Sequence, residues 1–308
     1  MAANKPFPVV DCSDWRIVAD ETSGVEEKRW LRRPDETLWL FKGVTEHETP
    51  MRGRWQQRED YAERLATALA QQLGVPCAQT ELAIYQGKRG TISASLKPDD
   101  DWELQPGAVL LGETMPDFVP HAKGRLGHSL ENIQAALEET GLPIGFDLPT
   151  GLTAFGVFAG YLTLDALVAN QDRHEDNWAV LLPPAPSTDR LLCPSYDHGS
   201  CLGFNLLPDR CETYLRSGQL ESYARKGVAQ RFEPPAGYDT FPSLVDFARR
   251  ALDLAGSMAA EHWLARVERL AEDEIDQVIE QVEGVLHPVA TFTKELVKLN
   301  RRRLLGEC

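Results

Sequence analysis

The segment "ANQDRHEDNWAVLL", residues 169–182, contains a polar run, with the six side chains of residues 172–177 at its centre, between two strongly apolar stretches. Before it, residues 151–170 have the length and composition of a buried helix, and after it "WAVLL" has those of a buried strand. Consecutive polar residues usually form a solvated loop tip. A polar loop held between two core elements instead indicates side chains with a chemical task.

The spacing within and after this loop indicates which task. Asp172 and Asn177 are separated by four residues, and Asp197 follows in "YDHG", an Asp-x-Gly turn. Kinase-type phosphoryl transfer needs a carboxylate that orients the attacking hydroxyl and accepts its proton, and an Asn and an Asp that hold Mg²⁺. The catalytic loop of protein kinases has the same Asp-to-Asn spacing. We therefore predict Asp172 as catalytic and Asn177 and Asp197 as metal ligands, joined by a hairpin.

The N-terminal third predicts a small sheet that binds the nucleotide. Residues 15–43 contain three apolar runs separated by turns at Ser23-Gly24 and Pro34-Asp35, which is typical of a β-meander. Lys42 ends the third run, where a cation would reach the α- and β-phosphates. The backbone amides of Ser23 and Gly24 would cover the phosphates, although this turn is a poor glycine loop without G-x-G-x-x-G.

A polar loop and then a helix follow this sheet. Residues 58–74 have helical periodicity, and the helix offers Glu63 as the partner that positions Lys42. Glu59, one turn away, is the alternative partner. Residues 80–96 then predict a hairpin that turns near 86–90.

The remainder of the chain predicts a second, helical lobe. Residues 97–120 are rich in Pro and Asp and read as an irregular lobe boundary. Helices are expected at about 129–140, 150–170, 243–256, 259–283 and 288–304. The fold class is therefore α+β, a two-lobed protein-kinase-like fold with a β-rich N lobe (1–97) and a larger helical C lobe (98–308).

Composition limits the possible partners and the location. The net charge is 32 − 47 = −15, which disfavours direct nucleic-acid binding and adsorption on anionic membranes. Six cysteines without a CxxC pair, and no N-terminal signal peptide, predict free thiols in a cytoplasmic protein. Residues 151–170 carry Asp165 and lack basic flanks, so we expect a core helix and no membrane span.

Several stretches resemble a known family. These are "GVEEKRWLRRP…LWLFKG", "AERLATALAQQLGVPCAQTELA", "GTISASL" and "ALVANQDRHEDNWAVL…YDHG". They resemble HipA-type serine/threonine kinases, especially the shorter proteins that share the HipA C-terminal domain, over residues 15 to about 205. The "DRHEDN" loop also resembles that of phosphatidylinositol 3-/4-kinases. The resemblance implies an ATP- and Mg²⁺-dependent kinase, HipA-toxin-like, that phosphorylates a serine or threonine of a protein.

The resemblance also assigns residues. The family's catalytic Asp falls on Asp172, its metal ligands fall on Asn177 and Asp197, and its phosphate-binding Lys falls on Lys42. The adenine-binding strand between the lobes falls near three residues, Ala94, Ser95 and Leu96. A small helix-turn-helix antitoxin protein is a possible partner by the same resemblance.

Two features depart from the family pattern. Full-length HipA proteins carry an extra N-terminal subdomain, whereas only about fourteen residues precede the first predicted strand here. Family members often phosphorylate a serine of their own phosphate loop. Thr22 or Ser23 could serve, but this loop is acidic, which disfavours self-phosphorylation.

Other residues of the motif have two interpretations each. His174 is either a catalytic proton carrier or a structural residue that bonds the loop backbone. Arg173 either binds a phosphorylated residue or pairs with a nearby carboxylate, and Asp176 is either a solvated acid or a third metal ligand. His198 occupies the place of the Phe in the Asp-Phe-Gly turn of protein kinases, so a mobile hydrophobic switch is not expected.

Alternative functions and sites remain open from the sequence. A lipid or small-molecule kinase would use the same loop, a non-catalytic nucleotide-binding module would keep only the binding residues, and a structural or interaction protein would need none of them. A separate metal site is conceivable from His128, Cys193 and Cys201, although packing is their default role.

Overall fold

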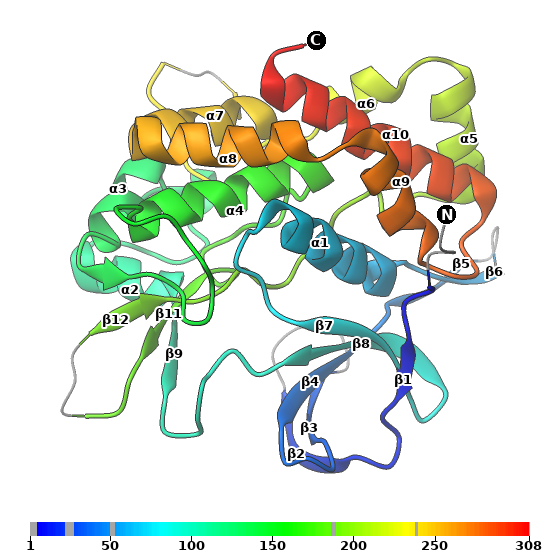
Figure 1. Cartoon of the computed structure of the whole chain (residues 1–308), viewed down its shortest axis with the longest axis horizontal. Coiled ribbons are helices and arrows are strands. Elements are labelled where there is room, and N and C mark those ends of the chain that lie inside the picture. The colour runs from blue at the N-terminus through cyan, green and yellow to red at the C-terminus, as the bar shows by residue number, and fades with distance from the viewer. Residues whose placement is uncertain (1–4, 22–27, 50–52, 186–188, 238–239, 308) are drawn as a thin grey trace.

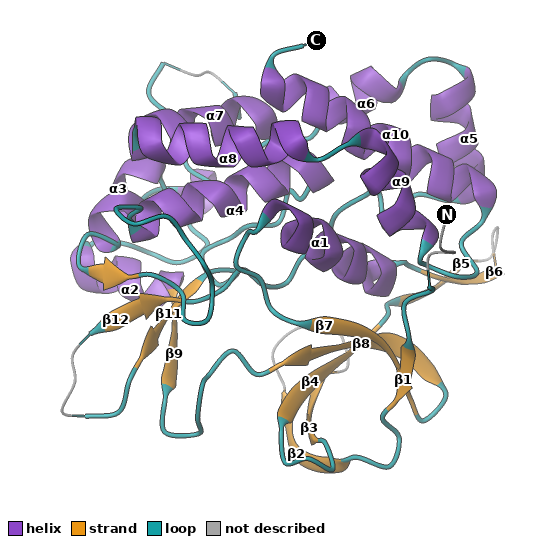
Figure 2. Ribbon diagram, viewed as in Figure 1, coloured by secondary structure: helices purple, strands orange, loops and turns teal. Residues whose placement is uncertain are grey.

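The structure of the chain is a computed structural model that describes residues 5–21, 28–49, 53–185, 189–237 and 240–307. The predicted phosphate loop, with Thr22, Ser23 and Gly24, lies outside these residues. Figure 1 shows a β-sheet at one end of the molecule and a layer of helices at the other, with α1 between them. Figure 2 shows the same separation of strands from helices.

The N-terminal part is a six-stranded sheet in the order β1-β7-β8-β4-β3-β2. Its strands are β1 (Val9–Asp11), β2 (Arg16–Glu21), β3 (Lys28–Arg32), β4 (Leu38–Gly43), β7 (Thr80–Tyr85) and β8 (Lys88–Ala94). The predicted meander is confirmed, because β2, β3 and β4 pair antiparallel in chain order. The predicted hairpin is also confirmed, with β7 and β8 joined at Gln86 and Gly87. Both turn residues have positive φ, 49° and 79°, as a two-residue hairpin turn requires.

In β4, the strand that carries Lys42, fully buried side chains alternate with partly exposed ones, as is typical of a half-buried strand. Trp39 and Phe41 are buried on its inner face, and they form a small core with Leu31 and Ile92. Gly90 on β8 lets the two strands approach closely, since a Cβ there would lie 2.1 Å from the backbone oxygen of Lys42. The position of Lys42 is therefore fixed by packing on both sides of its strand.

Helix α1 (Glu59–Leu73) joins the sheet to the helical part. Its apolar face, which includes Leu65 and Leu69, belongs to the same buried cluster as the helices of the second half of the chain. The helix ends at Gly74, whose φ of 69° gives a left-handed cap. The segment before α1, expected as a polar loop, forms a separate hairpin of β5 (Glu46–Thr49) and β6 (Gly53–Gln56).

The helical part is built around α4 (Ala154–Val168), in which every residue is buried. Helices α7 (Leu244–Ala255), α8 (Ser257–Arg269) and α10 (His287–Leu305) contact it. Gly160 allows α8 to approach closely, since a Cβ there would lie 2.4 Å from the Trp263 ring. The other helices are α2 (Gly107–Thr114), α3 (Leu130–Ala136), α5 (Pro208–Arg216), α6 (Leu220–Arg225), α9 (Glu272–Glu280) and the 3₁₀ helix η1 (Lys123–Arg125).

A second, four-stranded sheet carries the polar loop. It runs β10 (Thr140–Gly141), β12 (Arg190–Leu192), β11 (Ala179–Leu182), β9 (Glu103–Pro106). The predicted hairpin after Asn177 is confirmed, because β11 and β12 pair antiparallel. The chain passes from the first sheet to this one through residues 95–102, and the lobe boundary at residue 97 remains a prediction.

Two further secondary-structure predictions were wrong. Residues 97–120 are not irregular throughout, because β9 and α2 lie within them. The expected helix at 259–283 is two helices, α8 and α9, since Leu270 is extended (ψ 98°) and the amide of Ala271 donates to the Glu274 carboxylate at 2.9 Å. Across the described ranges, no helix has the length and apolar composition needed to cross a membrane.

Candidate functional site

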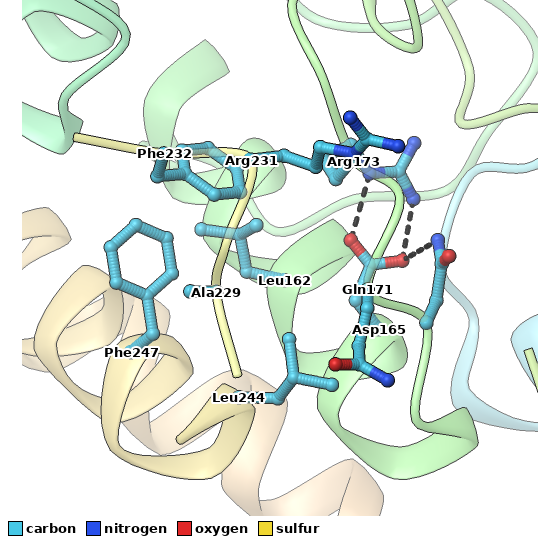
Figure 3. Close-up of a pocket in the computed structure, with 10 residues that line it drawn as sticks. Leu162, Asp165, Gln171, Arg173, Ala229, Arg231, Phe232, Leu244 and Phe247 are labelled. Carbon is cyan, nitrogen blue, oxygen red and sulfur yellow. Dashed lines mark hydrogen bonds and ion pairs between the residues drawn. The ribbon is translucent and has the colours of Figure 1, made fainter. Parts of the chain in front are cut away.

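The polar loop begins where α4 ends and is fixed by a buried ion pair. Arg173 donates through Nε to Oδ2 of Asp165 and through Nη2 to Oδ1, both at 2.8 Å. Both side chains are about 1–2% exposed, and Figure 3 shows the paired contacts. Burial lowers the pKa of Arg173, but the Asp165 carboxylate outweighs it and the net shift is upward. Of the two interpretations of Arg173, these contacts support the carboxylate pair.

Arg173 also joins the loop to the Asp-x-Gly turn. Its Nη1 donates to the backbone oxygens of Asn177, at 2.8 Å, and Tyr196, at 3.4 Å. The Tyr196 hydroxyl in turn donates to the backbone oxygen of Asp176 at 2.8 Å. Through the Arg173 guanidinium and the Tyr196 hydroxyl, these bonds connect the end of the polar loop to the residue before Asp197.

The residues present fit a magnesium ion. The side-chain amide of Asn177 donates to the backbone oxygen of Asp172 at 2.7 Å, which leaves the Oδ1 atom of Asn177 as the acceptor for another ligand. Asp197 adds carboxylate oxygens. Mg²⁺ prefers such oxygen ligands and takes few from the protein, completing its octahedron with phosphates and water. In the described ranges no three His, Cys, Asp or Glu residues cluster as a metal site.

Asp197 has a strained backbone and a cationic partner. Its φ of 57° lies in the left-handed region, which is costly for a residue with a side chain and occurs at functional sites. The ammonium of Lys42 lies 2.8 Å from its Oδ1 atom. Burial would raise the pKa of Asp197, but the charge and hydrogen bond of Lys42 outweigh burial and lower it to about 2.

A second lysine lies beside Lys42 and was not predicted. Lys28 on β3 is directly opposite Lys42 on β4, so both side chains leave the same face of the sheet. The charge of Lys28 also lowers the pKa of Asp197. Like charges on facing strand positions repel each other, so this arrangement favours a bound anion. The sequence signal for Lys28 is the register of the meander, which pairs Lys28 with Lys42.

Glu63 does not contact Lys42, and this prediction was wrong. Its Oε2 atom accepts a hydrogen bond from the backbone amide of His198 at 2.6 Å, and its Oε1 atom lies 3.3 Å from Nδ1 of the same residue. Glu59, the alternative, accepts from the amide of Thr45 at 3.1 Å. The physical reason is the histidine in place of a phenylalanine, because a buried imidazole needs a polar partner.

His198 is the middle residue of the Asp-x-Gly turn, and its side chain is fully buried. Its Nε2 atom lies 2.8 Å from Oγ of Ser195, opposite the contact with Glu63. Burial alone lowers the pKa of His198, but Cys77 and the Glu63 carboxylate outweigh it and raise the pKa to about 10. Glu63 therefore positions the turn that carries Asp197, as expected of a helix residue, but through His198.

Asp172 has partners at both carboxylate oxygens. Arg231 contacts Oδ1 through Nη2 at 2.7 Å and through Nε at 2.8 Å. The hydroxyl of Ser200 donates to Oδ2 at 3.3 Å. No sequence signal pointed to Arg231, which lies 59 residues beyond Asp172 in the chain. Arg231 and Arg173 lie side by side in Figure 3. Both line a small cavity whose wall also includes the rings of Phe232 and Phe247.

His174 and Asp176 have structural contacts. The backbone amide of His174 donates to the oxygen of Asp172 at 2.8 Å, and its Nδ1 accepts from the amide of Asp176 at 3.2 Å. Burial lowers the pKa of His174. The Asp176 carboxylate lies 2.9 Å from Nε2 of His121. These contacts favour the structural interpretation of His174, and its catalytic role remains untested.

The other predicted residues lie as follows. Ala94 and Ser95 donate their amides to Gln79 and Leu38, at 2.9 and 2.8 Å, at the end of β8. Leu96 packs against residues of the second sheet. These three residues therefore lie where the chain passes between the sheets, and their contact with a nucleotide remains a prediction.

The separate metal site weighed for His128 is not supported. His128 is buried, its Nε2 accepts from the Trp178 indole at 3.1 Å, and its Nδ1 lies 2.6 Å from the backbone oxygen of Arg231. Burial lowers the pKa of His128 to about 4. Cys193 and Cys201 are buried in different clusters, so packing is the role of all three.

Comparisons with known proteins identify the fold. No model of a known protein family matches the chain, and no curated protein matches its sequence. Among solved structures, the proinflammatory kinase CtkA of Helicobacter pylori matches with a TM-score of 0.75 and 16% identity over 97% of this chain and 96% of that one. HipA of Shewanella oneidensis, solved with HipB and operator DNA, matches with a TM-score of 0.56 and 13% identity over 93% of this chain and 65% of that one. The chain therefore has a two-lobed, α+β protein-kinase-like fold.

Proposed function

We propose that this protein is a HipA-like serine/threonine kinase that transfers the γ-phosphate of ATP to a hydroxyl of a protein. The observation that carries the proposal is the joining of three functional elements. Arg173 connects the loop of Asp172 and Asn177 to the turn of Asp197, and Lys42 reaches the same turn from the N-terminal sheet.

The residues divide the work of phosphoryl transfer. Asp172 orients the acceptor hydroxyl and receives its proton, as the acceptor oxygen forms a bond to the γ-phosphorus. The bond from that phosphorus to the β,γ-bridging oxygen breaks, and its electron pair leaves with ADP. Asn177 and Asp197 would hold Mg²⁺, which neutralises phosphate charge when bound. Lys42 adds a positive charge at the phosphates, and Ser23 and Gly24 would cover them.

The similarity in fold to the Helicobacter kinase and to HipA supports kinase activity in general. The choice of a protein acceptor over a lipid or small-molecule acceptor rests on the resemblance of the sequence motifs to HipA-type kinases. HipA was solved together with HipB, which supports a small helix-turn-helix antitoxin as a partner of this chain too. A cytoplasmic location is part of the proposal, and the free thiols of the described cysteines support it.

Transfer from radiolabelled ATP tests the proposal. The purified protein and the Asp172→Ala variant are incubated with γ-labelled ATP and Mg²⁺, alone and with a cell extract. We expect label on protein serine or threonine with the wild type only. Label on the chain itself at Thr22 or Ser23 would identify self-phosphorylation. Label that appears only in inositol lipid or sugar would replace the protein acceptor. Bound ATP without any transfer would support a non-catalytic nucleotide-binding module.

A further inference from the structure

We propose that Arg231 is a catalytic residue that stabilises the transferred phosphoryl group from the acceptor side. The inference rests on the kinase activity proposed above and adds a residue outside the catalytic loop. Arg231 contacts only one oxygen of Asp172, Oδ1, and does so through Nε and Nη2. Its third nitrogen, Nη1, has no partner within the described residues. The side chain is 34% exposed, so this nitrogen can reach a bound ligand.

The backbone of Arg231 is held by a hydrogen bond to the buried side chain of His128. This distinguishes the contact between Arg231 and Asp172 from an ordinary surface ion pair. Nε2 of His128 accepts a hydrogen bond from Trp178, so the ring proton lies on Nδ1 and is donated to the backbone oxygen of Arg231 at 2.6 Å. The His128 ring stacks on Phe232 with 4.5 Å between centroids, and Phe232 packs on Phe247 at the same distance. A buried aromatic stack thus holds the residue that presents its guanidinium to Asp172.

The two oxygens of Asp172 have different partners. Oδ1 faces Arg231, and Oδ2 accepts from the hydroxyl of Ser200 at 3.3 Å. A hydroxyl that donates to the catalytic carboxylate is what an acceptor serine or threonine would provide, so Ser200 marks the oxygen that an acceptor would use. The γ-phosphorus would lie about 3–3.5 Å beyond the acceptor oxygen in a reactive geometry. A guanidinium on the neighbouring oxygen of the same carboxylate is then within reach of the transferred group.

The other basic side chains near Asp172 have different contacts, so Arg231 is the one placed to stabilise the transferred phosphoryl group. Arg173 is buried and uses its guanidinium on Asp165 and on backbone oxygens. Burial lowers the pKa of His174 and favours its neutral form. Lys42 contacts Asp197 on the nucleotide side. In phosphoryl transfer, an arginine supplied from outside the nucleotide-binding loops stabilises charge on the transferred group. Arg231 forms no covalent bond and takes no proton in this step.

A phosphoryl mimic tests the inference without an identified acceptor. Calorimetry measures the affinity for Mg²⁺–ADP with and without aluminium fluoride, which imitates the transferred group, for wild type, Arg231→Met and Arg231→Lys. Arg225→Met is the matched control, because Arg225 forms an exposed ion pair with Glu221 at 2.7 Å. We expect fluoride to tighten binding by the wild type and the control. In Arg231→Met, the increase in affinity on adding fluoride should be at least about 100-fold smaller than in the wild type, while the affinity for Mg²⁺–ADP alone stays within about twofold of the wild type. Arg231→Lys should keep part of the increase.

Each other outcome is decisive. If Arg231→Met keeps the full fluoride gain, or loses affinity for Mg²⁺–ADP in the same proportion, Arg231 only supports the structure and the inference is wrong. A wild type that binds Mg²⁺–ADP but gains nothing from fluoride would also overturn the inference alone. A folded wild type that binds no Mg²⁺–ADP would overturn the proposed function, and the inference with it. Circular dichroism of each variant confirms that it is folded.

Discussion

The ammonium group of Lys42 lies 2.8 Å from the Oδ1 atom of Asp197. This contact joins the N-terminal sheet to the turn that carries a proposed metal ligand, across 155 residues of sequence. Lys42 would neutralise phosphate charge and Asp197 would hold a cation, so the pair brings both functions to one place. It also gives the stability of the protein a defined dependence on pH.

Lys42→Met should reduce stability in a pH-dependent manner. The folded-state pKa of Asp197 is lowered from 3.8 to about 2, so the ionised pair contributes stability above pH 3.8, and this contribution is lost as the pH falls through 2. We expect the variant to lose roughly 1–2 kcal/mol of unfolding free energy at pH 6. Urea unfolding followed between pH 6 and 2 measures it. The difference in unfolding free energy from wild type should be constant above about pH 4 and shrink as the pH falls towards 2. A difference that stays constant or grows over that lower range contradicts the linkage.

Asp172→Asn and Asp197→Asn should separate catalysis from nucleotide binding. Asp172 contacts Arg231 and Ser200, so its amide variant should keep its affinity for Mg²⁺–ATP and lose transfer by at least about 100-fold. Asp197→Asn removes a proposed metal ligand and should lose most Mg²⁺-dependent binding. Calorimetry with ATP, with and without Mg²⁺, checks both. Equal affinity of the two variants for Mg²⁺–ATP would refute the assignment of roles.

Arg173→Met should destabilise the whole protein. The substitution leaves the buried carboxylate of Asp165 without its charged partner, which typically costs about 3–5 kcal/mol. Arg225→Met breaks an exposed pair with Glu221 and should cost less than about 1 kcal/mol. Chemical denaturation of both variants measures the difference. Equal small losses would show that the Arg173 pair contributes little to the fold.

The sequence predicts the parts of this site that lie close together in the chain. Asp172 and Asn177 are both in one loop, and a hairpin brings Asp197 to them, so local spacing was sufficient. Lys42 could be placed because β-strand alternation and chain order located its strand. These predictions depend on period-two patterns and short connections, which are local properties.

Contacts that depend on tertiary packing could not be predicted in this way. Arg231 reaches Asp172 because a buried stack holds its backbone, and no local pattern in the sequence describes that stack. The sequence favoured Lys42 as the partner of Glu63 because the two side chains carry opposite charges. In the structure Glu63 bonds His198 instead. His198 is fully buried, and leaving a buried polar group without a hydrogen bond is costly.

The pairing of Glu63 with His198 can be tested by a double-mutant cycle. Glu63→Ala leaves the amide and ring of His198 without their acceptor, and His198→Phe removes the ring that needs it. We expect a coupling energy of about 1–3 kcal/mol between these two substitutions. Glu63 and Lys42 share no direct contact in the described chain, so the cycle of Glu63→Ala with Lys42→Met serves as the control and should give a smaller coupling.

The same cycle has a predicted dependence on pH. The folded-state pKa of His198 is raised to about 10, so the stabilising contribution of its charged form is complete below the ordinary value near 6.5 and is lost as the pH rises through 10. Urea unfolding at pH 6, 8 and 10 should therefore show a coupling between Glu63 and His198 that decreases with pH. If the larger coupling were instead found between Glu63 and Lys42, Glu63 would position the lysine directly. The Asp-x-Gly turn would then not depend on His198 for its connection to α1.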